Sequence, residues 1–136
     1  MDSFCFRFAY RVGVADINYG GHVANSAVLT IFQDARIAYF AALGPYSELD
    51  LGGCGIILPE AHAYFRAEMF LGDELQVGVR CKELKRSSFV LVYRIERSGV
   101  LTAEGETPVV CFDYQTRRPC RMPEAFRQAL LSFEQP

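Results

Sequence analysis

Hydrophobic and polar residues alternate at the start of the chain. Every second position in this segment carries an aromatic or aliphatic side chain: Phe4, Phe6, Phe8, Tyr10 and Val12. A period of two is typical of a strand with one buried face, so these residues predict a half-buried β-strand.

The next hydrophobic pattern has the period of a helix. Between residues 27 and 43, one helical face carries Val28, Phe32, Ala35, Tyr39 and Leu43. Further apolar residues between them (Leu29, Ile31, Phe40 and Ala42) make the helix apolar nearly all round, which indicates that other elements wrap it. Asn25 and Ser26 are good N-cap residues, and Gly44 with Pro45 predicts the end of the helix.

Four strand-like runs follow the helix. They cover residues 56–67, 74–84, 88–97 and 101–114, and turn sequences separate them. A short C-terminal helix is expected after Pro123, which suits a first helical turn. Strands joined by short turns form antiparallel sheets. We therefore expect one α+β domain, residues 1–136, in which a curved five-stranded sheet surrounds one long helix.

Composition excludes several classes of protein. Hydrophobic residues make up 51% of the chain and charged residues 22%, which is typical of a globular fold. The net charge of −2 and the scattered basic residues do not fit a general nucleic-acid binder. We see neither a membrane span nor a signal peptide. The five cysteines lack metal-ligand spacing, so we expect no metal and reduced thiols in the cytoplasm.

Hydrogen-bonding residues and glycines gather just before the long helix. Asp16, Asn18 and His22 surround Gly20 and Gly21 in this segment. A helix N-terminus offers unpaired N–H groups and the positive end of the helix dipole, which can polarise a carbonyl and hold an oxyanion. The same residue types also form ordinary turns, so composition leaves both interpretations open.

Four segments together resemble the hotdog-fold thioesterases of the 4-hydroxybenzoyl-CoA thioesterase-like branch. "ADINYGGHVANSAVLTIFQDARIAYF" is similar to that family's D-x-D-x-x-G-H-V-N-N…(E)-A-R-x-x-Y/F signature. "AYFRAEMFLGDELQV" resembles its Y-x-x-P-a-x-x-G-D-x-L-x-V motif. "KRSSFVLVYRI" and "TPVVCFDYQTRRPCRMP" extend the likeness, which covers about residues 5 to 127 in the order of the family.

The resemblance implies a hotdog fold and the hydrolysis of acyl-CoA thioesters by water. It implies a homodimer whose sheets join edge to edge, with the acyl chain at the interface, and many members pair dimers into homotetramers. Coenzyme A would enter as part of the substrate, so no cofactor is expected. The resemblance leaves open which acyl chain is preferred and whether coenzyme A or an acyl carrier protein delivers it.

The chain departs from the family at the catalytic carboxylate. Asn18 stands at the second aspartate of D-x-D-x-x-G, and an amide cannot accept a proton as a carboxylate does. The missing carboxylate would come from Asp16 or from Glu60. We place Glu60 on the strand that, in relatives, faces the N-terminus of the long helix. His62 shares the face of Glu60 and is expected to be a helper or a surface residue.

The remaining site residues follow from the same comparison. His22, Val23 and Asn25 would hold the thioester carbonyl through their N–H groups. Substrate contacts are expected from a further set: Tyr19, Gly21, Lys82, Lys85, Arg86, Ser87 and Ser88. The basic residues and serines of this set, together with Arg117 and Arg118, would hold the phosphates of coenzyme A, although such residues are usually only solvated.

Two other functions compete with hydrolysis. Hotdog hydratases that act on enoyl or hydroxyacyl thioesters use D-x-N-P-x-H, and "DINYGGH" differs by Tyr19 at the proline and one additional residue before His22. A non-catalytic protein that binds acyl thioesters is the third candidate, because Asn18 replaces the catalytic aspartate.

Overall fold

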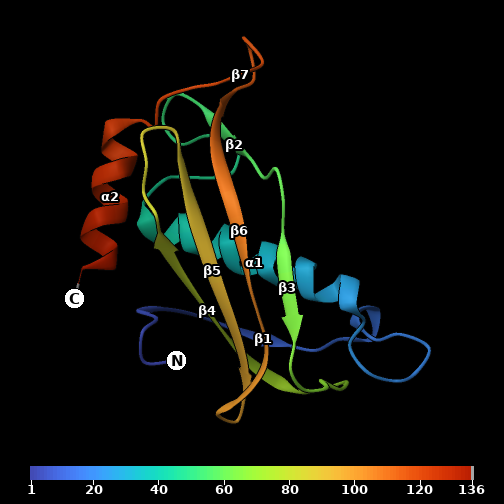
Figure 1. The fold of residues 1–136 in the computed structure, drawn as a ribbon. Helices are drawn as coiled ribbons and strands as arrows, with labels where there is room; N and C mark the ends of the chain where they lie inside the picture. The colour runs from blue at the N-terminus through green and yellow to red at the C-terminus, as the bar shows by residue number, and fades with distance from the viewer. Residues whose placement is uncertain (136) are drawn as a thin grey trace.

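The computed structural model describes residues 1–135 and has one long helix lying in the hollow of a curved antiparallel sheet (Figure 1). The strands are β1 (Phe6–Arg11), β2 (Gly55–Ile57), β3 (His62–Phe65), β4 (Glu74–Lys82), β5 (Ser88–Arg97), β6 (Val100–Asp113) and β7 (Arg118–Pro119). The helices are α1 (Asn25–Leu43) and α2 (Glu124–Glu134), with a 3₁₀ turn η1 at Val14–Asp16. The predicted α+β architecture is confirmed.

The sheet is five strands wide. Its order is β1-β4-β5-β6-β2, and β3 and β7 also pair with β6. The β6 partners of β3 (Ala103–Glu106) and Val110, a partner of β2, pair with β5 on their other side, so β3 and β2 follow one another along the same edge of β6. The predicted run 56–67 is therefore two short strands. Pro59, which has no N–H to donate, lies in the break.

The long helix begins one residue earlier than its sequence suggests. We expected Asn25 or Ser26 at the N-cap, but Ala24 occupies that position and no side chain caps the helix. Pro123 likewise lies at the N-cap of α2 rather than inside its first turn. At α1 the neighbouring backbone sets the start of the helix, because the Ala24 N–H donates to the Asp16 carbonyl at 2.9 Å.

One face of α1 forms the core against the sheet. Val28, Phe32, Ala35 and Tyr39 are at most 1% exposed, as the pattern predicts. Gly105 of β6 makes room for Phe32, since a Cβ there would come within 2.7 Å of the ring. The opposite face is not covered by this chain, because Leu29 is 43% and Ile37 50% exposed. The helix is thus wrapped on one side only.

The core also contains a charged group that the pattern does not predict. Arg36 is buried, its Nη1 donates to the Tyr93 hydroxyl at 3.1 Å, and its Nε lies 3.3 Å from a Glu48 carboxylate oxygen. The Tyr93 hydroxyl lies 2.6 Å from the Thr107 hydroxyl. This network joins α1 to the sheet and to the loop after α1.

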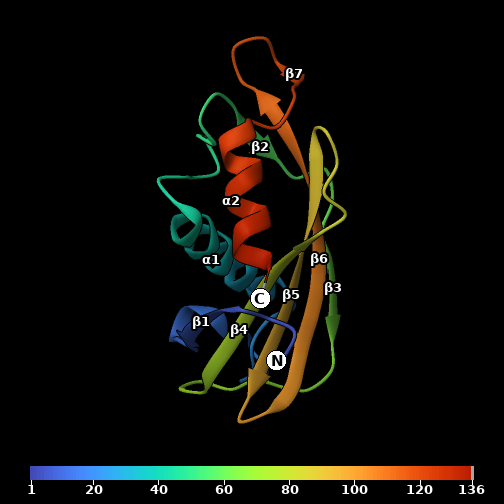
Figure 2. The same ribbon diagram turned by 90° about the vertical axis from the view of Figure 1, so that its left-hand side faces the viewer.

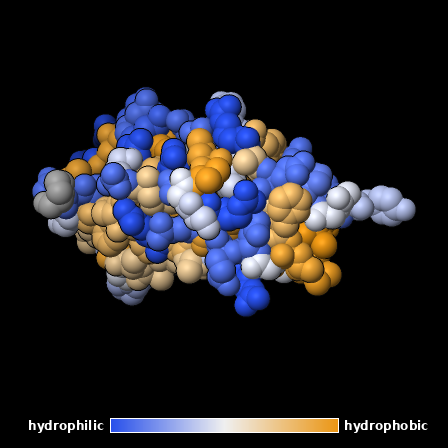
Figure 3. Space-filling view, turned by 90° about the horizontal axis from the view of Figure 1, so that it is seen from below, coloured by the Kyte–Doolittle hydropathy of each residue, from blue (hydrophilic) through white to orange (hydrophobic). Residues whose placement is uncertain are grey.

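The C-terminal helix α2 covers the hollow of the sheet beside α1 (Figure 2). Phe126 and Leu130 bury its inner face. At the other end of the molecule, the loop before α1 leads into the helix near the end of β3. Seen from below, this end has hydrophobic residues separated by hydrophilic ones (Figure 3).

Candidate active site

Asp16 stabilises the segment that precedes α1 through side-chain hydrogen bonds. Its Oδ2 accepts hydrogen bonds from the Tyr10 hydroxyl at 2.7 Å and from the Gly13 N–H at 2.9 Å, and the residue is 9% exposed. Burial, followed by the bond to Asp16, raises the pKa of Tyr10 to about 12, so the hydroxyl remains a donor at neutral pH. A carboxylate oxygen with two donors is well suited to holding a turn and poorly suited to taking a proton from water.

The next residues form a tight turn between Asn18 and His22. The Asn18 N–H donates to the His22 carbonyl at 2.9 Å, and the Gly21 N–H returns a bond to the Asn18 carbonyl at 3.0 Å. The Asn18 side-chain oxygen accepts from the Gly20 N–H at 2.9 Å. Gly21 has a φ of 85°, which glycine adopts without strain. The glycines therefore shape a turn that carries His22 to the helix mouth.

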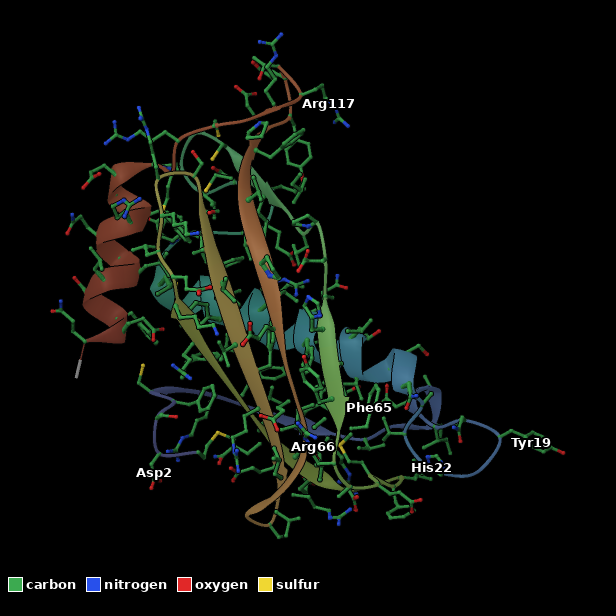
Figure 4. The ribbon with its side chains drawn as sticks, viewed as in Figure 1. Asp2, Tyr19, His22, Phe65, Arg66 and Arg117 are labelled. Carbon is green, nitrogen blue, oxygen red and sulfur yellow. The ribbon has the colours of Figure 1, made fainter. Side chains whose placement is uncertain are left out.

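Tyr19 occupies the tip of this turn and does not join the other predicted residues. Its side chain is fully exposed and points into solvent, away from the body of the molecule (Figure 4). Within one chain, Tyr19 cannot contact a substrate held at the start of α1. Its predicted substrate contact stays a prediction that would require another molecule to approach the loop.

The start of α1 leaves the expected donor of Asn25 free, but not that of Val23. The Val23 N–H donates to the Met69 carbonyl at 2.8 Å, so it is not available to an oxyanion. Within residues 1–135, the N–H groups of Asn25 and Ser26 donate to no backbone or side-chain oxygen. A capping side chain would occupy the N–H of Ser26 or Ala27, and this helix has no such cap, while the N–H of Asn25 at the first helical position has no partner within the helix. The first N–H group of the helix without an acceptor is therefore that of Asn25.

Asn25 borders a cleft between the start of α1 and the end of β3. The cleft has a volume of about 280 Å³, and its wall on the helix side comprises His22, Val23, Asn25 and Val28. Phe65, Arg66, Ala67, Glu68 and Met69 form the other wall. The structure therefore brings the three predicted carbonyl-binding residues His22, Val23 and Asn25 together, with His22 half-buried.

Glu60 does not lie at this cleft. It precedes β3 and its Oε1 is 2.7 Å from His62 Nε2, with both side chains about half exposed. His62 is opposite Glu106, whose neighbour Gly105 faces the core, so His62 points to the outer face of the sheet. Our placement of Glu60 at the helix mouth is therefore corrected: the break at Pro59 puts it outside, paired with His62.

Glu68 and Arg66 line the cleft although we did not select them from the sequence. Arg66 donates to Glu104 at 3.0 Å and lies over the Tyr64 ring at 5.3 Å. Figure 4 labels Arg66 together with Phe65 and His22. A sequence signal for Glu68 exists. When Y-x-x-P-a-x-x-G-D is aligned on Gly72 and Asp73, Glu68 occupies the proline position, which is an unexpected place for a charge.

The basic residues predicted to hold phosphates lie at the other end of the sheet. Ser88 is opposite Val110 of β6, and Phe65 is opposite Ala103. Seven residues of strand separate the two levels, or roughly 20–25 Å. Lys85, Arg86 and Ser87 belong to the same distant loop, and Lys82 pairs with Glu106 at 2.8 Å. Arg117 lies farther still (Figure 4). One chain does not bring these residues to the cleft.

The five cysteines take no part in the cleft. All are free, and none lines its walls. Burial raises the pKa of Cys54 and of Cys81 to about 12 and that of Cys111 to about 11, so their thiolates are scarce at neutral pH. This agrees with the expectation that these thiols are not nucleophiles.

Neither a metal cluster nor a membrane helix occurs in the part of the chain that the structure describes. No three His, Cys, Asp or Glu side chains of residues 1–135 are arranged to hold a metal ion. No helix among these residues is both long and apolar enough to cross a membrane.

Comparisons with known proteins agree on one family. The sequence model of the thioesterase-like superfamily matches residues 12–130. A 1,4-dihydroxy-2-naphthoyl-CoA hydrolase of Trichodesmium erythraeum is 30% identical over 134 residues, which cover 93% of this chain and 97% of the relative. A hydrolase of the same name from Synechococcus elongatus is 27% identical over 92% of this chain and 94% of the relative.

Solved structures give the same result. A thioesterase of Thermus thermophilus, crystallised with coenzyme A and Zn, superposes with a TM-score of 0.88 at 31% identity, covering 100% of this chain and 99% of the other. A gentisyl-coenzyme A thioesterase superposes with a TM-score of 0.83 at 25% identity, covering 92% of this chain and 99% of the other.

Proposed function

Because the chain belongs to the thioesterase-like superfamily, we propose that it hydrolyses acyl-CoA thioesters to the free acid and coenzyme A at the cleft beside α1. The observation that carries this proposal is the pair of unoccupied N–H groups, on Asn25 and Ser26, at the start of a 19-residue helix. The reaction needs only water and the thioester, so it requires no cofactor beyond the coenzyme A of the substrate.

The helix start supplies the stabilisation that acyl transfer needs. When water attacks the thioester, negative charge develops on the carbonyl oxygen. Backbone N–H groups and the positive end of the α1 dipole stabilise that charge without having to reorganise. His22 lies in the same wall of the cleft and can donate a further hydrogen bond to the substrate.

The walls of the cleft favour an aromatic acyl group. Val28, Phe65 and Met69 give it apolar and aromatic surfaces, with the polar groups confined to the helix start and to the side chains of Arg66 and Glu68. The relatives that are named for their substrates hydrolyse 1,4-dihydroxy-2-naphthoyl-CoA or gentisyl-CoA, both of which carry aromatic acyl groups. We propose an aromatic acyl-CoA as the substrate class.

A panel of acyl-CoAs tests this function against the two alternatives. Aromatic and aliphatic acyl-CoAs are incubated with the protein while free thiol and enoyl absorbance are followed together. We expect thiol release, fastest with aromatic acyl groups. Loss of enoyl absorbance without thiol would indicate a hydratase, and binding without either signal would indicate a non-catalytic binding protein.

The proposed enzyme acts as a homodimer in the cytoplasm. The free edge of β3 exposes Tyr64 and Phe65 at 49% and 48%, and α1 exposes Leu29 and Ile37 on its uncovered face. A partner that pairs with this edge would cover those side chains and could bring its own distant basic loop toward the coenzyme A. The unpaired cysteines fit a reducing compartment.

The mass in solution tests the dimer. Light scattering at micromolar concentration is expected to give at least twice the 15.3 kDa of one chain. A Tyr64→Glu variant should shift the protein toward a monomer, because it puts a charge on the proposed edge, while Leu131→Glu on the exposed face of α2, away from that edge, should not. A monomeric wild-type protein with full activity would contradict the proposal.

A further inference from the structure

Hydrolysis needs a group that takes a proton from the attacking water, and neither Asn18 nor the two predicted carboxylates, Asp16 and Glu60, supply one at the cleft. Asn18 is an amide, and its oxygen is engaged with Gly20. The Oδ2 of Asp16 accepts hydrogen bonds from the Tyr10 hydroxyl and the Gly13 N–H. Glu60 lies on the outer face of the sheet beside His62. His22 lines the cleft, but a carboxylate base there must come from another residue.

We propose that Glu68 is the catalytic carboxylate that activates water in this cleft. This inference rests on the proposed thioester hydrolysis. It names a residue that the family motifs did not point to as catalytic. Among residues 1–135, Glu68 is the one carboxylate residue in the cleft wall, which it shares with His22 and Asn25. Glu68 therefore lines the same cleft as Asn25, whose backbone N–H would hold the thioester oxygen.

The backbone around Glu68 is fixed on both sides. The N–H groups of Arg66 and Ala67 donate to the Thr102 carbonyl at 2.8 and 3.1 Å. An Arg97 guanidinium donates to the Glu68 carbonyl at 2.6 Å. The next residue, Met69, accepts the Val23 N–H at 2.8 Å, which ties this segment directly to the entry of α1. A general base needs such fixed geometry with respect to the bound carbonyl.

The side chain of Glu68 is free to act. Its carboxylate accepts no hydrogen bond and forms no ion pair within residues 1–135, and the neighbouring Arg66 is already paired with Glu104. The N-terminus of α1 borders the same cleft, and its dipole attracts a negatively charged group. Glu68 thus combines a position in the cleft with an unused carboxylate.

The step is a simple hydrolysis. A water molecule donates a proton to the Glu68 carboxylate while its oxygen bonds to the thioester carbon, and the electron pair of the carbonyl moves to its oxygen beside the Asn25 and Ser26 N–H groups. The pair then returns, the carbon–sulfur bond breaks, and the thiolate takes the proton from Glu68. The products are one carboxylic acid and one thiol.

Isosteric variants test the assignment. Glu68→Gln is expected to lower kcat by about 10²–10⁴-fold, because a positioned base typically contributes that much, with KM nearly unchanged. Glu60→Gln is the matched control, since it neutralises another exposed glutamate near β3, and it should keep the wild-type kcat. Melting temperatures of both variants should match wild type.

Chemical rescue distinguishes a catalytic carboxylate from a structural one, because an added carboxylate cannot restore a lost structural contact. In Glu68→Ala, added formate should restore part of kcat in proportion to its concentration, because it can occupy the space of the missing carboxylate. A Glu68→Gln variant that turns over like wild type, or a loss of kcat that formate does not restore, would overturn the assignment to Glu68 alone. A wild-type protein that releases no thiol from any acyl-CoA would overturn the proposed function as well.

Discussion

Replacing Asn25 by proline is expected to lower kcat by about 10²–10³-fold, because it deletes one backbone donor that we assign to the oxyanion. Proline removes the N–H at this position together with the asparagine side chain. Asn25 is the first residue of α1, where helices tolerate proline well. Ala24 before it has φ −70° and ψ 149°, an extended conformation that a following proline favours. The helix should therefore form normally and lose only a donor.

The control for this variant is Asn25→Ala, which removes the same side chain and keeps the N–H. We expect Asn25→Ala to retain most of kcat, so the difference between the two variants measures the backbone donor. Steady-state kinetics with the best acyl-CoA of the panel, together with melting temperatures, gives the comparison. Equal losses in the two variants would indicate that the side chain matters and that the oxyanion is held elsewhere.

Replacing Asp16 by alanine should destabilise the fold by roughly 2–3 kcal/mol, because it leaves the Tyr10 hydroxyl and the Gly13 N–H without their charged acceptor. The loss should appear in the free energy of unfolding measured with urea. Activity should fall with it, since the position of the turn that carries His22 depends on Asp16. Tyr10→Phe removes one of the two donors and should cost about 1 kcal/mol.

Asp16→Asn separates a structural role from a catalytic one. The amide oxygen can still accept one of the two hydrogen bonds, so this variant should fold and keep a substantial kcat per folded molecule. If it melts like wild type and yet hydrolyses nothing, then Asp16 is the base. In that case both our structural interpretation of Asp16 and the assignment to Glu68 would be wrong.

The hydrophobic pattern is sufficient to identify most of the elements of the fold because it is a local property. The alternation at Phe6, Phe8 and Tyr10 gives β1, and the period at Val28, Phe32 and Tyr39 gives the buried face of α1. The run 88–97 is β5 without change. The short β7 and the division at Pro59 were missed, since pairing with β6 defines them and no local period marks them.

The sequence by itself also determined the family and the part of the chain that forms the helix mouth, because turn residues and glycines act through their own backbone. Only the tertiary structure decided which groups at that mouth are free. Whether the Val23 N–H is occupied depends on Met69, and whether Asp16 is engaged depends on Tyr10. Which carboxylate faces the cleft depends on how β3 pairs with β6, a contact between residues far apart in the chain. That pairing turns Glu60 outward and places Glu68 beside the start of α1.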